Sequence, residues 1–177
     1  MKTAVFWDIE NIAPTKKNHI LDNVETWLDK MGDIVYKCVA ANCYTIKREQ
    51  LVNVYEKGYA IECIPKYEKN ATDGILIRKI QERTILDDEI QLYVLVTQDS
   101  DFKNIIKELK EKDKFVVLLH VGNRMKKEFI KLPDIAYNIN QKCNIKEIEE
   151  VLQKKVKKNQ HKVIEFKKYK YSRIGVS

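Results

Sequence analysis

The sequence predicts an α/β protein built on a parallel β-sheet flanked by helices, and three observations lead to this prediction. Strand-like runs at 4–7, 34–41, 59–64, 92–96 and 115–120 alternate with segments whose apolar residues recur at helical spacing. The run at 92–96 is apolar throughout, which is typical of a strand buried on both faces. Acidic residues follow the runs at 4–7 and 92–96, at once in the first case and after two residues in the second, at the edge where such sheets hold their ligands.

The first two helices are delimited by local start and stop signals. Asn18 can cap a helix whose apolar positions end near Met31, with Gly32 as the stop signal. Thr45 can cap a second helix that ends at Gly58. Because these helices alternate with the strands, right-handed crossovers and a parallel sheet are expected.

The second half of the chain repeats this alternation. A polar loop at 66–73 leads into a helix from Gly74 to about Arg83, with Asp73 in its first turn. Apolar residues at helical spacing then predict a helix from 102 to about 111. The remaining expected elements are a short helix at 125–130, an edge strand at 135–139 and a last helix at 145–156.

Length and charge predict one folded domain with a basic extension. A chain of 177 residues is long enough for one well-packed domain and too short for two full ones. The net charge is +7, but nine basic residues and one acidic residue lie beyond position 153. We therefore expect a domain at 1–153 and a basic C-terminal extension at 154–177.

Nothing in the sequence predicts a membrane segment or a secretion signal, so we expect a cytoplasmic protein without a membrane partner. The four cysteines, Cys38, Cys43, Cys63 and Cys143, form no C-x-x-C pair. We interpret them as buried thiols in a reducing compartment.

Three aspartates are expected at one edge of the sheet. If the strands at 4–7 and 92–96 are adjacent and parallel, Asp8, Asp99 and Asp101 meet there. Two carboxylates about 4 Å apart repel by roughly 4 kcal/mol at an effective dielectric near 20, so a cation must offset the charge. Oxygen ligands without a nearby thiol or imidazole favour Mg2+ or Mn2+. Each aspartate alone has an ordinary explanation as a helix cap, and only the group favours a metal site.

The sequence lacks the residues that several other kinds of catalytic or binding site require. The five glycines are scattered, so the chain has no phosphate-binding glycine loop. The three histidines lie in unrelated places, which argues against a ribonuclease that uses paired histidines and against a histidine-activated Ser100. A nucleophilic Asp8 stays open, although aspartyl-phosphate enzymes would have a second aspartate where this chain has Glu10.

Three segments together resemble the NYN domains of the PIN-like nuclease superfamily. They are FWDIENI at 6–12, Asp73 at the head of a helix, and TQDSDF at 97–102. The resemblance covers about residues 1–140. It implies a Rossmann-like sheet with strand order 3-2-1-4-5 and a metal-dependent ribonuclease site at its carboxyl edge.

By position, the resemblance implies that Asp8, Asp73, Asp99 and Asp101 are the catalytic, metal-binding acids and that Asn11 contacts the substrate at the same site. Two departures stand out. Gln98 occupies a place that is usually glycine, and the middle motif has lysine at Lys69 instead of three residues before its aspartate, where Asn70 stands. A weakened, RNA-binding member of the family is therefore an alternative to an active endoribonuclease. A transferase that uses residues 99–101 as a metal-nucleotide clamp is a second alternative.

Basic residues supply the expected contacts to RNA. Lys66, Lys69 and Arg78 are candidate phosphate ligands near Asp73, with solvated surface charge as the alternative. In the extension at 154–177, lysines are interleaved with aromatic residues that can stack on unpaired bases at roughly 1–3 kcal/mol each. A disordered, solubilising end is the alternative there. A homodimer is also possible, with Tyr67 or Tyr93 as surface residues unless they pack in the core.

Overall fold

A computed structural model gives the fold of the chain. It describes residues 1–15, 19–65, 71–122, 125–141 and 150. The chain divides into two compact units, Met1–Cys143 and Asn144–Ser177. The second unit lies outside the described residues except for Glu150, and so do the predicted helix at 145–156 and the extension at 154–177.

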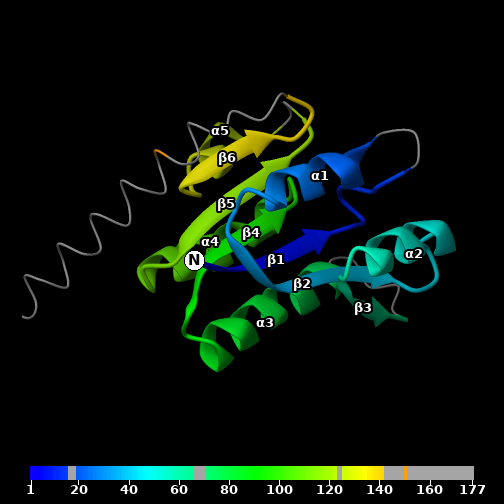
Figure 1. The fold of residues 1–177 in the computed structure, drawn as a ribbon, viewed down its shortest axis with the longest axis horizontal. Coiled ribbons are helices and arrows are strands. Elements are labelled where there is room, and N and C mark those ends of the chain that lie inside the picture. Colours follow the sequence, from blue (N-terminus) through cyan, green and yellow to red (C-terminus); the bar gives the residue numbers. More distant parts are fainter. Residues whose placement is uncertain (16–18, 66–70, 123–124, 142–149, 151–177) are drawn as a thin grey trace, which may run out of the picture. The chain divides into compact units, whose positions relative to one another are not determined.

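Six parallel strands form one sheet in the order β3-β2-β1-β4-β5-β6 (Figure 1). The α/β class and the Rossmann-like order 3-2-1-4-5 are confirmed, and the expected edge strand lies beside β5. The strands are β1 (Lys2–Asp8), β2 (Asp33–Asn42), β3 (Ala60–Ile64), β4 (Ile90–Val96), β5 (Phe115–His120) and β6 (Ile135–Asn138). Because β1 is flanked by β2 and β4, the strand order reverses there, which is where open α/β sheets bind ligands.

Helices follow each of the first five strands. They are α1 (Ile20–Leu28), α2 (Arg48–Glu56), α3 (Ala71–Leu86), the short 3-10 helix η1 (Ser100–Phe102) continuing into α4 (Lys103–Glu111), and α5 (Lys127–Ile130). None of the helices in the described ranges is long and apolar enough to cross a membrane.

The central strands are buried on both faces, as their apolar runs predict. Phe6 and Leu95 belong to a core cluster that also includes residues of α3, α4 and α5. On the alternate positions, Trp7 is fully buried and its ring contacts the ring of Tyr59 edge-on at 5.7 Å. Tyr93 is fully buried. It therefore packs in the core, which was the alternative to a place on a dimer surface.

The predicted start of the second helix is wrong. α2 begins at Arg48 after Lys47 as its N-cap, and Thr45 does not cap it. The backbone N–H groups of Thr45 and Ile46 instead bond to the carbonyl of Asn42, which makes a turn directly after β2. The hydroxyl of Thr45 donates to Oε1 of Glu10 instead.

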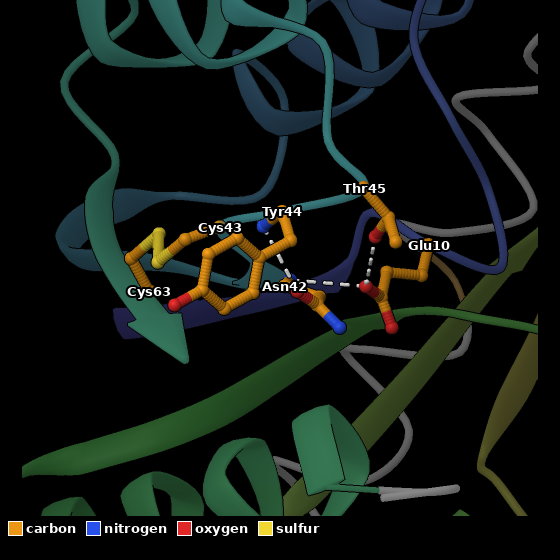
Figure 2. Close-up of a disulfide and its surroundings, with 6 residues drawn as sticks. All are labelled: Glu10, Asn42, Cys43, Tyr44, Thr45 and Cys63. Atoms are coloured by element: carbon orange, nitrogen blue, oxygen red, sulfur yellow. Dashed lines mark hydrogen bonds between the residues drawn. A yellow bond between two sulfur atoms is a disulfide. The ribbon is translucent and has the colours of Figure 1, made fainter. Parts of the chain in front are cut away.

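The interpretation of the cysteines as buried thiols is also wrong for two of them. Cys43 and Cys63 are exposed and form a disulfide, with their Cα atoms 5.4 Å apart (Figure 2). They meet because parallel β2 and β3 pair Ala41 with Cys63, which brings the ends of both strands together. Cys38 is a buried free thiol, and Cys143 lies outside the described residues. The inference of a reducing compartment rested on four free thiols, so the disulfide removes that support. A cytoplasmic location stays a prediction.

Candidate metal centre

Four aspartates come from three elements that end or begin at the carboxyl edge of the sheet. Asp8 is the last residue of β1, and Asp99 and Asp101 follow the neighbouring strand β4. Asp73 lies in the first turn of α3. Asp8 and Asp73 are buried, with 3% and 8% of their surface exposed, whereas Asp101 is exposed. Burying a carboxylate is unfavourable unless hydrogen bonds or a cation compensate for the lost water.

Hydrogen bonds fix the side chain of Asp8. Its Oδ1 accepts the backbone N–H of Asn11 at 3.2 Å, and its Oδ2 accepts the hydroxyl of Thr97 at 3.0 Å. The Thr97 hydroxyl also accepts the backbone N–H of Asp99 at 3.1 Å, and Asn11 Oδ1 accepts the backbone N–H of Gln98 at 3.0 Å. These bonds connect the turn after β1 to the turn after β4.

A tight turn places the second pair of acids. Asp99 caps η1, and its Oδ1 accepts the backbone N–H of Asp101 at 2.9 Å. This cap is the ordinary role expected for a single aspartate at a helix start. Phe102, which follows, is fully buried and anchors η1 to the core. The turn therefore holds two carboxylates beside each other on a fixed backbone.

Three of the four predicted acids form a compact group. Asp73, Asp99 and Asp101 each offer one carboxylate oxygen, and these oxygens lie within 4.8 Å of one another. Asp8 is not in this group, and each of its oxygens accepts one hydrogen bond, from the backbone of Asn11 and from the hydroxyl of Thr97. It nevertheless lies near enough for Asp73 and Asp99 to raise its pKa. Its role as a direct metal ligand stays a prediction.

The electrostatics of the site disfavour charge without a cation. Burial, followed by repulsion from Asp73, raises the pKa of Asp8 from 3.8 to about 7, although the bonds from Thr97 and Asn11 oppose the shift. Burial, followed by repulsion from Asp99 and Asp101, raises the pKa of Asp73 to about 6. Both shifts have the direction expected for buried acids that face other acids. A bound cation would reverse the effect of the repulsion.

The donor set fits a hard divalent ion. All three ligating groups are carboxylates, and oxygen ligands are those that Mg2+ and Mn2+ prefer. Ligand oxygens around one octahedral Mg2+ lie at most about 4.2 Å apart, and the three oxygens here lie within 4.8 Å of one another. The site is therefore compatible with a divalent metal held by Asp73, Asp99 and Asp101.

Two polar residues beside the acids were not singled out by sequence reasoning. The hydroxyl of Thr72, which is 6% exposed, donates to Oε2 of Glu10 at 2.8 Å. Oε1 of Glu10 accepts the backbone N–H of Asn42 at 3.0 Å and the hydroxyl of Thr45 at 3.4 Å (Figure 2). The signal that could have pointed to Glu10 is its place in the acidic motif after β1. No local pattern indicated that it would reach α3.

The predicted RNA contacts are only partly brought to the site. Asn11 joins it, as described above, and with Gln98, Asp99, Ser100 and Met125 it lines a pocket of about 230 Å³. Arg78 is exposed on α3, with its Nε 3.9 Å from Glu82 Oε1. Five residues after Asp73, it points roughly 140° around the helix axis from that aspartate. Lys66 and Lys69 lie outside the described residues, so all three basic side chains stay predictions.

Comparison with known proteins decides the family. The family model for the NYN domain matches residues 2–140 of the chain. This chain belongs to the NYN domain family. The match spans the whole sheet and every described acid of the candidate metal centre. NYN domains are PIN-like nuclease-type domains, and membership of this family supports a hydrolase.

A solved structure supports the fold alone. A crystal structure of a protein of unknown function from Vibrio parahaemolyticus RIMD 2210633 matches with a TM-score of 0.60 and 16% sequence identity. The match covers 78% of this chain and 92% of that protein. No curated protein matches the chain.

Proposed function

We propose that this NYN protein is a divalent-metal-dependent endoribonuclease that hydrolyses phosphodiester bonds of RNA. The observation that carries the proposal is the group of three carboxylates from Asp73, Asp99 and Asp101 within 4.8 Å of one another. The group lies where the strand order of the sheet reverses, in a domain whose family is nuclease-like. Mg2+ or Mn2+ is the ion that this donor set favours.

Each acid has a distinct part in the proposal. Asp73, Asp99 and Asp101 would hold the ion. Asp8 would stabilise the arrangement of the site. One of its oxygens binds the backbone N–H of Asn11 in the turn after β1, and the other binds the hydroxyl of Thr97 after β4. In the metal-free protein the pKa of Asp8 is raised to about 7, so binding of a cation beside it near neutral pH would favour release of its proton. The chemistry that a divalent ion supplies when bound is activation of a water and neutralisation of phosphoryl charge.

Substrate binding needs positive charge to compensate for these carboxylates. In the proposal, the bound ion supplies part of it at the cleavage site. The extension at 154–177, with nine basic residues interleaved with Phe166, Tyr169 and Tyr171, supplies the rest by binding the RNA backbone and stacking on unpaired bases. Asn11 stays a candidate substrate contact, since it lines the pocket next to Asp99.

One observation favours a second candidate, a weakened RNA-binding NYN module. Gln98 stands where NYN sequences usually have glycine, and its half-buried side chain lines the same pocket as Asp99. A side chain there takes up space through which substrate could approach. Such a protein would keep its affinity for RNA and lose cleavage.

Cleavage of a mixed, end-labelled RNA by the wild type and by Asp99→Asn, each with Mn2+, Mg2+ or chelator, tests the proposal. We expect metal-dependent cutting that Asp99→Asn abolishes, because the substitution removes one carboxylate of the group. Asp29→Asn is the matched control, because Asp29 is an exposed acid at the end of α1 and is not one of the candidate metal ligands. This variant should cut like the wild type. Binding of RNA without cleavage under any metal would favour the weakened module, and a Gln98→Gly variant would then show whether that side chain is the cause.

Deletion of residues 157–177 tests the role of the extension. We expect weaker RNA binding with a flatter dependence on salt, because the number of released counterions falls with the number of lysines. Binding that is unchanged in affinity and salt dependence would contradict the role.

A further inference from the structure

Glu10 connects three elements at the carboxyl edge of the sheet. It lies two residues after Asp8, in the turn that follows β1. Its Oε1 binds the backbone N–H of Asn42, the last residue of β2, and its Oε2 binds the hydroxyl of Thr72, the second residue of α3 (Figure 2 shows the Asn42 side of this arrangement). The side chain thereby joins the ends of β1 and β2 to the first turn of α3.

The contact with Thr72 bears directly on the candidate metal centre. Thr72 precedes Asp73 in the chain, and both are buried in the first turn of α3. The hydrogen bond from Thr72 to Glu10 limits how far this turn can shift relative to the turn after β1. The Asp73 carboxylate is carried by this same turn, next to the residue that Glu10 contacts.

The chain keeps this contact although it has an electrostatic cost. Glu10 is one of the acids whose repulsion raises the pKa of Asp73. A carboxylate placed beside a site that already has three acids disfavours the charged state of that site. The donors from Asn42, Thr45 and Thr72 offset the cost at Glu10, and both of its oxygens face protein donors. Glu10 is also absent from the group of acids whose oxygens converge.

We propose that Glu10 is a positioning residue for the nuclease reaction, acting through Thr72 to hold Asp73 in place beside Asp99 and Asp101. This inference rests on the proposed function for its effect on cleavage. Its effect on metal binding and on the first turn of α3 does not depend on whether the protein cuts RNA.

Three variants separate the positioning role from a direct one. Glu10→Ala removes the acceptor for both bonds. Glu10→Gln keeps one oxygen for the Asn42 N–H and offers an amide N–H to the Thr72 hydroxyl, which can accept. Thr72→Val removes only the hydroxyl at nearly the same volume. Glu89→Ala is the control, because Glu89 is an exposed carboxylate paired with Lys2 at the opposite, amino edge of the sheet.

We expect Glu10→Ala to lower kcat by about 10- to 100-fold, since small misplacements of a reacting constellation have effects of this size. KM for RNA should change little, because Glu10 does not contact the substrate in this account. Glu10→Gln should keep a kcat close to that of the wild type, and Thr72→Val should lower kcat as Glu10→Ala does. The double variant Glu10→Ala/Thr72→Val should have a kcat no lower than that of Glu10→Ala alone. Glu89→Ala should behave like the wild type.

Two measurements without RNA complete the test. Binding of Mn2+ should weaken in Glu10→Ala and Thr72→Val and recover in Glu10→Gln. Amide exchange at Leu76, whose N–H pairs with the carbonyl of Thr72 in the helix, should speed up in the same two variants. These readouts stand even if the wild type cuts no RNA, so a failure of the nuclease proposal is distinguishable from a failure of this one.

Two outcomes would overturn the inference. If Glu10→Gln is as damaging as Glu10→Ala, the charge of Glu10 acts on metal or substrate directly. If Glu10→Ala leaves Mn2+ affinity and exchange at Leu76 unchanged, Glu10 does not hold the first turn of α3. A Thr72→Val variant whose effect adds fully to that of Glu10→Ala would equally exclude the route through Thr72.

Discussion

Replacing Asp8 by asparagine should stabilise the metal-free protein at alkaline pH. Burial and the neighbouring Asp73 raise the pKa of Asp8 from 3.8 to about 7. Because the folded-state pKa is the higher one, the folded protein holds a proton between these values that the unfolded chain has released. The contribution of Asp8 to stability therefore falls as pH rises from about 4 to 7.

The size of the effect follows from this shift. At pH 8 Asp8 is ionised in both states, and keeping it charged in the folded protein costs about 4 kcal/mol. At pH 5 the same relation gives less than about 2 kcal/mol. Asp8→Asn removes this cost, because asparagine is neutral, and the pKa of about 7 already includes the opposing effect of the bonds from Thr97 and Asn11. The free energy of unfolding should thus rise by about 4 kcal/mol at pH 8 and by under about 2 kcal/mol at pH 5.

Urea unfolding in the presence of chelator, followed by the fluorescence of the buried Trp7 and Trp27, measures both values. Asp29→Asn, a substitution at an exposed position, is the control and should change stability by less than about 0.5 kcal/mol at either pH. An Asp8→Asn variant that is less stable than the wild type at pH 8, or that gains equally at both pH values, would refute the account of Asp8 as a buried acid under repulsion.

Three further outcomes are expected. In thermal scans, Mn2+ should raise the Tm of the wild type more at pH 8 than at pH 6. Protons compete with the metal for the site, because the pKa values of Asp8 and Asp73 are about 7 and about 6. Equal increases in Tm at the two pH values would contradict this. Reducing the disulfide between Cys43 and Cys63, which are 20 residues apart, should lower the free energy of unfolding by up to about 3 kcal/mol, and a double serine variant should not respond to reductant in urea titrations. Ile80→Ala, at a fully buried position of α3, should cost about 3 kcal/mol in the same titrations, and a loss below about 1 kcal/mol would contradict its place in the core.

The architecture of the sheet was predictable because its signals are local. Strands buried on both faces give continuous apolar runs, such as that at 92–96, and the crossover helices between them show helical spacing. The acids after two of these runs could be assigned to one edge because parallel neighbours end together. Asp73 was placed in the first turn of a helix by the same local reasoning, and the structure has it there.

What the sequence did not indicate depends on contacts between distant segments. Cys43 and Cys63 meet only because β2 and β3 pair in one particular register, with α2 between them in the chain. The hydroxyl of Thr45 fits a helix cap locally, but the turn after β2 directs it to Glu10. The bond from Thr72 to Glu10 spans 62 positions, so no spacing rule predicts it.

The separation of Asp8 from the three converging acids has the same origin. In the sequence, Asp8, Asp99 and Asp101 look equivalent, since each follows a buried strand. Only the folded chain shows that the oxygens of Asp8 accept hydrogen bonds from Thr97 and the backbone of Asn11 and do not belong to the converging group. Asp73, from a helix, is the acid whose oxygen joins Asp99 and Asp101.

Titration of Mn2+ into the wild type and into Asp73→Asn, Asp99→Asn and Asp101→Asn, with free Mn2+ followed by electron paramagnetic resonance, tests the central claim most directly. Circular dichroism of each variant checks that it is folded, and Asp29→Asn serves as the exposed control. We predict saturable binding by the wild type and the control, and a large loss of affinity in each of the three variants, because each removes one of the converging carboxylates. Equal binding by all five proteins would contradict the assignment of this site as the metal centre.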